Sequence, residues 1–123
     1  MENETLDYII EYSSFEGKFK KTEVSAEEVG ELIMHMTGHF IRYNVRFAES
    51  LRAFSAVKAK FQNQVDPLSG KAMSTSKAEI LADDTTEAAI YQMAKIHVNN
   101  IQEILNSMKS LQKAIMQEYS NTA

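Results

Sequence analysis

The chain has 123 residues, a length typical of a single domain, and its 44% hydrophobic and 24% charged residues are ordinary for a soluble protein. No apolar run approaches the ~18 residues that a membrane span needs, and the absence of cysteine excludes disulfides and thiolate chemistry. Because the first residues are acidic and lack the basic start of a secretory signal, we expect a cytoplasmic protein with no membrane contact.

The net charge of −4 is unevenly distributed along the chain. The formal charge is −6 over residues 1–41, +5 over residues 42–77 and −3 over residues 78–123. A basic segment within an acidic chain has two explanations. Its charges either lie on solvated helix faces and pair between subunits, or they contact an anionic partner such as nucleic acid.

The first predicted element is a β-hairpin over residues 5–24, which forms an N-terminal segment 1–24. Residues 6–12 alternate between two faces with a period of two, residues 13–17 can turn, and residues 19–24 can return as a second strand. A two-stranded hairpin is marginal alone in water. We therefore expect it to lie on a helix or to pair with an edge of another subunit.

A long helix is predicted over residues 26–63. Ser25 can cap it, and Glu28 has the spacing that completes a capping box. Phenylalanines recur every seven residues along this helix and form one ridge on its surface. They are Phe40, Phe47, Phe54 and Phe61. Residues 36–39, around Gly38, are the place where we expect a kink or a break, because glycine weakens a helix.

A loop over residues 64–73 follows, since Asp66-Pro67 and Ser69-Gly70 favour turns. The next helix is predicted over residues 74–119, with Asp83-Asp84 as a second candidate start, and residues 120–123 are expected to be frayed. The two long helices together form a helical hairpin over residues 25–119.

Apolar residues of the second long helix also repeat every seven residues and match the phenylalanine ridge. We expect these two stripes to form the core and oligomer seam. The seam residues are Phe40, Phe47, Phe54, Phe61, Ile101, Met108 and Ile115. Helices of roughly 50 Å or more are too long for a compact monomer, and such wide stripes need further neighbours. The sequence thus predicts an α+β fold, mainly α, in which an N-terminal hairpin and two antiparallel helices assemble into a homo-oligomeric bundle, a dimer or higher.

The sequence contains few candidates for chemistry. His35 and His39 share a helix face with Glu31 one turn earlier, but a third ligand of the usual zinc type is missing. No glutamate is followed three residues later by histidine, which argues against a di-iron bundle. Residues 67–72 lack the first glycine of a phosphate-binding loop. We therefore predict no metal, no cofactor, no catalytic residues and no enzymatic activity.

The basic segment is the candidate nucleic-acid-binding region. Basic grooves with aromatic side chains hold single strands, but here the phenylalanines lie on the packing ridge, so phosphate contacts are the expected route. The candidate residues are Arg42, Arg46, Arg52, Lys58, Lys60, Lys71 and Lys77.

A basic Lys/Ala-rich helix over residues 52–60, a polar connection and a second helix ending in residues 104–114 follow one another within residues 51–119. This segment resembles small helical proteins of phages and mobile elements, and is loosely similar to the recombination-mediator family of T-even phages. The resemblance implies an oligomer in the host cytoplasm that binds single-stranded DNA and helps to load a recombinase. The alternative is a structural or assembly adaptor that binds a protein partner and has no nucleic-acid role.

Overall fold

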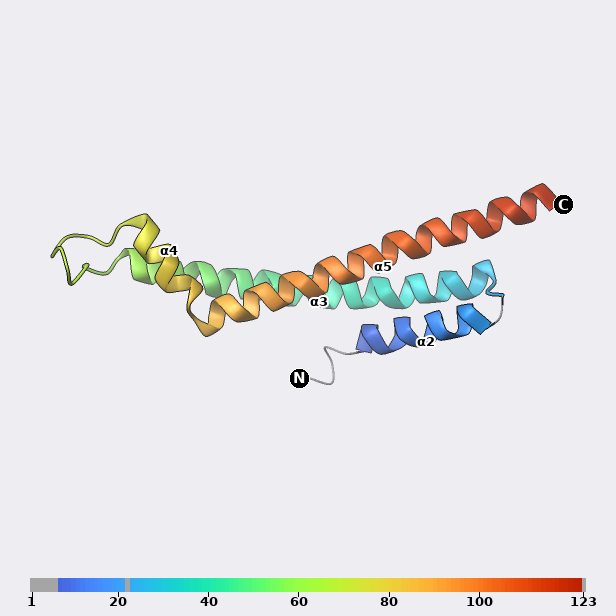
Figure 1. Ribbon diagram of the computed structural model, residues 1–123, viewed down its shortest axis with the longest axis horizontal. Coiled ribbons are helices and arrows are strands. Elements are labelled where there is room, and N and C mark those ends of the chain that lie inside the picture. Colours follow the sequence, from blue (N-terminus) through green and yellow to red (C-terminus); the bar gives the residue numbers. More distant parts are fainter. Residues whose placement is uncertain (1–6, 22, 123) are drawn as a thin grey trace. The chain divides into compact units, whose positions relative to one another are not determined.

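The computed structural model describes residues 7–21 and 23–122, and nearly all of them are helical. The elements are α2 (Asp7–Lys21), α3 (Ala26–Gln62), α4 (Thr75–Asp83) and α5 (Thr86–Thr122) (Figure 1). Contacts divide the chain into a terminal unit, Met1–Arg42 with Asn99–Ala123, and a central unit, Tyr43–Val98. Each of α3 and α5 contributes one segment to each unit.

The predicted β-hairpin is wrong, because residues 7–21 form α2 and the described residues form no strand. The prediction used an alternation that covers only a few residues, whereas the aromatic residues Tyr8, Tyr12, Phe15 and Phe19 have helical spacing. Tyr8 is fully buried and its ring contacts that of His39 on α3. This packing overrides the strand propensity of the segment, so the fold is all-helical, not α+β. Residues 5, 6 and 22 of the predicted hairpin lie outside the described residues.

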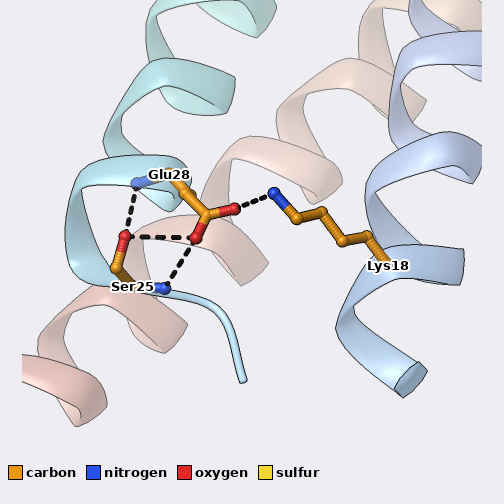
Figure 2. A network of polar contacts seen from close by, with 3 residues as sticks. All are labelled: Lys18, Ser25 and Glu28. Carbon is orange, nitrogen blue, oxygen red and sulfur yellow. Dashed lines mark hydrogen bonds and ion pairs between the residues drawn. The ribbon is translucent and has the colours of Figure 1, made fainter. Parts of the chain in front are cut away.

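The start of α3 carries the predicted capping box (Figure 2). The amide of Glu28 donates to Ser25 Oγ at 3.2 Å, and the amide of Ser25 donates to Glu28 Oε1 at 3.4 Å. Lys18 of α2 forms an ion pair with the same carboxylate. The hydrogen bond from Lys18, followed by those from Ser25, lowers the pKa of Glu28. This network connects α2 to the first turn of α3.

The α3 helix continues without a break through residues 36–39, where the sequence predicted a kink or a break. Within this stretch, Thr37 donates its hydroxyl to the carbonyl of Ile33 at 2.7 Å, which leaves the helical pattern intact. The helix ends at Gln62, one residue before the predicted end.

Large side chains fill the core of the terminal unit, which the helices α2, α3 and α5 build together. The buried hydrophobic residues of these helices are Tyr8, Val29, Leu32, Met36, Ile101, Leu105 and Met108. Gln112 of α5 also donates to the carbonyl of Ala26 at 3.2 Å and connects α5 to the start of α3.

The core of the central unit combines aromatic side chains, mostly from α3, with small residues of α4 and α5. Phe54 of α3, Ala82 of α4 and Ala88 of α5 form its buried cluster, with Val57, Phe61 and Tyr91 packed around it. The ring of Tyr91 lies between two phenylalanines of α3, with centroids 5.5 Å from Phe47 and 5.3 Å from Phe54. Alanines on α4 and α5 allow those helices to approach α3 closely.

The helix predicted over residues 74–119 is interrupted at residues 84–85. Ser74 caps α4 and accepts a hydrogen bond from the amide of Lys77 at 3.2 Å. Thr85 ends α4 and begins α5, because its hydroxyl donates to the carbonyl of Ala82 at 2.6 Å and accepts from the amide of Ala88 at 3.2 Å. The helix α5 then continues to Thr122 and includes residues 120–122, which were expected to be frayed.

Candidate functional site

Arg42, the first of the seven predicted DNA-contacting residues, belongs to the terminal unit and contacts a buried histidine. Its guanidinium lies 2.6 Å from His39 Nδ1, and since arginine can only donate, this nitrogen accepts. The other ring nitrogen, Nε2, then carries the proton and lies 3.2 Å from the carboxylate of Glu11 on α2. The pair of contacts fixes the tautomer of His39 and connects α2 to α3.

Two basic side chains of the central unit lie on aromatic rings. The guanidinium of Arg46 is 5.0 Å from the centroid of Tyr43, and the ammonium of Lys58 is 4.3 Å from the centroid of Phe54. Lys58 follows Phe54 by four residues, so it belongs to the phenylalanine side of α3 and not to the opposite face. Cation–π contacts of this kind hold both charges against the helix surface.

Arg46 also affects a histidine across the central unit. The ring of His97 on α5 lies 5.6 Å from that of Tyr43. Burial, and after it the positive charge of Arg46, lowers the pKa of His97. The neutral imidazole is therefore favoured beside the guanidinium.

Lys77 forms an ion pair with a residue of the loop between α3 and α4. Its ammonium lies 2.7 Å from the buried carboxylate of Asp66, which also accepts from the amide of Leu68 at 2.9 Å. The hydrogen bond from Lys77, followed by that from Leu68, lowers the pKa of Asp66. Gly70 completes the turn with a φ of 70°. The charge of Lys77 thus stabilises the loop conformation.

The three remaining predicted residues are exposed and make no ion pair or ring contact with the described residues. They are Arg52 and Lys60 on α3 and Lys71 in the loop. Of the seven basic residues predicted to bind nucleic acid, four therefore contact other side chains of the chain, and three make no such contact with the described residues.

The predicted seam residues are also distributed over both units. Phe40 is half-buried in the terminal unit, where Ile101 and Met108 are buried and Ile115 is half-buried. In the central unit Phe54 is buried, and Phe47 and Phe61 are half-buried. The fully buried line of α3 runs beside the phenylalanine ridge and includes two polar residues, His39 and Ser50, which the sequence analysis missed.

The central unit carries exposed aliphatic side chains on α4 and α5, and Ile80, Ile90 and Met93 among them lie on the sides remote from the buried alanines. Ile80 of α4 keeps 69% of its surface exposed, although its neighbours Ala78 and Ala82 are completely buried. On α5, Ile90 and Met93 keep 56% and 52%. We call the full set the outer aliphatic residues. They are Ile80, Leu81, Ile90, Met93 and Ile96. The signal in the sequence was the number of apolar residues on these helices, which is too large for one buried face.

Charge also separates within the central unit. Its α3 segment, residues 43–62, carries four basic side chains and one acidic one. Residues 75–98, which contain α4 and the start of α5, carry four acidic side chains and two basic ones. On α4, the acidic residues Glu79 and Asp83 are both exposed, lie one turn apart next to Ile80, and pair with no described residue.

The terminal unit contains a hollow of about 310 Å³ between α2 and α5. Tyr8 and Tyr12 line it from α2, and Asn100 and Glu103 from α5. Burial raises the pKa of the Tyr8 hydroxyl, although a hydrogen bond with Asn100 acts in the opposite direction. A second hollow, of about 660 Å³, follows the face of α5 that carries Lys109 and Met116.

The described residues, 7–21 and 23–122, contain no metal site and no membrane-spanning helix. Glu11 is within 3.7 Å of His35 and 3.2 Å of His39, but no described group of three or more histidines and carboxylates has an arrangement that could hold a metal ion. Within the same part of the chain, no helix is both long enough and apolar enough to span a membrane.

Comparison of the chain with protein-family models, with curated proteins and with solved structures finds no match.

Proposed function

We propose that this protein is a self-associating helical protein that acts by binding, and that further helices cover its central unit. The observation that supports this proposal is that, on α4 and α5 of that unit, small side chains are buried while larger apolar side chains are exposed. Three alanines, Ala78, Ala82 and Ala88, are buried, while the larger outer aliphatic residues remain exposed. A monomeric protein usually has the opposite distribution.

The energetic argument concerns the surface that the monomer leaves in water. Complete burial of one Ile, Leu or Met side chain contributes roughly 1.5–3 kcal/mol. The outer aliphatic residues keep between 42% and 69% of their surface exposed, so only that share of the contribution remains to be gained from a partner. Clusters of exposed apolar residues with charged neighbours are typical of protein interaction sites. The terminal unit differs in its core, which large side chains fill, although apolar residues such as Ile10, Met34 and Ile41 are exposed there too.

Sedimentation velocity at micromolar concentration tests this function. We expect the wild type to sediment as a dimer or larger species. Met93→Gln in the central unit should shift the distribution towards monomer. Met34→Gln is the matched control, because Met34 is also exposed, at 66%, but lies in the terminal unit. A wild type that remains monomeric over the whole concentration range would contradict the proposal.

The second candidate function is binding of single-stranded DNA by a recombination accessory that helps to load a recombinase. The specific support is the three exposed basic residues without ion pairs, Arg52, Lys60 and Lys71. Phosphate contacts with a single strand reduce log K with log salt by roughly 0.7 per contact. In a salt-titrated assay, Ala substitution of these three residues should therefore flatten the slope. Ala substitution of Arg46 and Lys58, which lie on rings, should change it less. No affinity at low salt would eliminate this candidate.

A further inference from the structure

Several exposed charges of the central unit make no ion pair with the described residues, and four of them occur as two pairs of opposite sign. Arg52 and Lys60 lie on α3, eight residues or roughly 12 Å apart. Glu79 and Asp83 lie on α4, four residues or roughly 6 Å apart. The extra distance on α3 is within the reach of its long basic side chains.

The exposed side chains between these charges also differ in size on the two helices, being large on α4 and small on α3. Ile80 lies between the two acidic residues on α4 and projects from the side opposite Ala78. Between Arg52 and Lys60, the exposed residues of α3 are small, namely Ala53, Ser55, Ala56 and Ala59. Small residues let a neighbouring helix approach closely and leave room for an isoleucine side chain. The exposed surface of α4 is therefore acidic with a projecting isoleucine, and that of α3 is basic with room for such a side chain.

We propose that the partner of the outer side of α4 is α3 of a second copy of this chain. Glu79 and Asp83 pair with the partner copy's basic residues at positions 52 and 60, and Ile80 packs on the alanines between them. A two-fold dimer forms this contact twice, because each copy contributes one α3 and one α4. This inference rests on the self-association proposed above and specifies which surfaces meet.

Charge exchange tests the contact. The basic-side variant is Arg52→Glu with Lys60→Glu, and the acidic-side variant is Glu79→Lys with Asp83→Lys. Each variant alone places like charges opposite each other, so we expect its self-association to weaken by about tenfold or more. An equimolar mixture places opposite charges in both contacts of the mixed dimer. We therefore expect the mixture to associate with nearly the affinity of the wild type.

Controls separate this contact from general effects of charge. Lys109→Glu with Lys113→Glu makes the same charge change as the basic-side variant on exposed residues of the terminal unit, and it should leave association unchanged. Circular dichroism checks helicity, and Arg52→Ala with Lys60→Ala replaces the basic-side variant if that variant unfolds. This neutral replacement should also weaken association, by less than the charge reversal.

The outcomes distinguish the two proposals. If the wild type is monomeric, the proposed function fails. If the wild type associates but both variants associate equally well, or if mixing does not restore association, self-association stands and the contact between α3 and α4 is overturned. Loss of single-stranded DNA binding in the basic-side variant, with unchanged self-association, would also overturn it.

Discussion

The two units of this chain differ in the size of the side chains that they bury between their helices. In the terminal unit, the fully buried side chains are large, among them Tyr8, Met36 and Ile101. In the central unit, alanines occupy the positions where α4 and α5 meet α3, and the isoleucines lie outside. The terminal unit thus fills its core with large side chains, whereas the central unit places alanines in the contacts of α4 and leaves isoleucines of α4 and α5 exposed. Both units also leave some large apolar side chains exposed, Met34 and Ile41 among those of the terminal unit.

Polar residues show the same difference. The terminal unit buries His39 between Glu11 and Arg42, so charged groups of different helices meet inside the unit. In the central unit, Glu79 and Asp83 on one side and Arg52 and Lys60 on the other remain exposed. Contacts between the helices of the terminal unit indicate a structural role, although one oxygen of Glu11 is buried there and makes no hydrogen bond with the described residues. Complementary charges exposed on the central unit are instead available for assembly.

The largest expected effect comes from two isoleucines of α5. Ile101 is fully buried in the terminal unit, and Ile96 is 49% exposed in the central unit. Ile101→Ala should lower the free energy of unfolding by about 2–5 kcal/mol, because it leaves a cavity. Ile96→Ala should cost less than about 1 kcal/mol in dilute monomer. Urea denaturation at low protein concentration measures both, and equal losses would contradict the difference between the units.

A smaller effect is expected from enlarging an alanine of the central core. Ala82 is completely buried against Phe54 and Ala88. Ala82→Leu should destabilise the protein by about 1–3 kcal/mol, because the close approach of α4 leaves no room for the larger side chain. Ala89→Leu on the exposed side of α5 is the control. A neutral Ala82→Leu in thermal denaturation would mean that this core is loosely packed.

Two glycines of α3 should respond differently to alanine. A Cβ at Gly38 would meet only Arg42 Nη1 at 3.6 Å, an ordinary contact, so Gly38→Ala should stabilise by about 0.5–1 kcal/mol. A Cβ at Gly30 would lie 3.0 Å from Nε2 of Gln112, which donates to the carbonyl of Ala26. Gly30→Ala should therefore gain less. Equal gains in chemical denaturation would show that the Gln112 contact is unimportant.

The smallest expected effect is a pH dependence of the central unit. The pKa of His97 is lowered on folding, so the unfolded chain binds this proton more readily. Stability is complete above the unfolded pKa of about 6.5 and decreases as the pH falls from there towards the folded pKa. The Tm of the wild type should fall more than that of His97→Gln between about pH 7.5 and about pH 5.5. Every other titratable group is the same in both proteins, so the difference reports His97.

Local signals in the sequence predicted the parts of the fold that local interactions determine. The capping box of Ser25 and Glu28 formed as its spacing indicated. The hairpin over residues 5–24 was wrong because the helical state of α2 depends on burying Tyr8 against α3, which a short sequence window does not contain. The α4–α5 break at Thr85 was one of two readings that the sequence left open.

The candidate site was predictable only in part. The basic residues were visible in the sequence, and three of their contacts are with residues three or four positions earlier on α3, a spacing that the sequence also contains. The ion pair of Lys77 with Asp66 depends on the conformation of the loop, which the sequence did not specify. The buried line of α3 passes through Val29, Met36, Tyr43 and Ser50, which also repeat every seven residues. A serine and a tyrosine in this line carry a weak hydrophobic signal, so the phenylalanines beside them dominated the pattern.

The most direct test of the central claim is amide hydrogen exchange measured at two protein concentrations, one above and one below the self-association transition. We predict that protection in α4 and in residues 86–98 rises with concentration, while protection in residues 26–42 and 99–113 stays the same. Protection that is independent of concentration in both units, or that rises equally in both, would contradict an account in which a second copy covers the central unit alone.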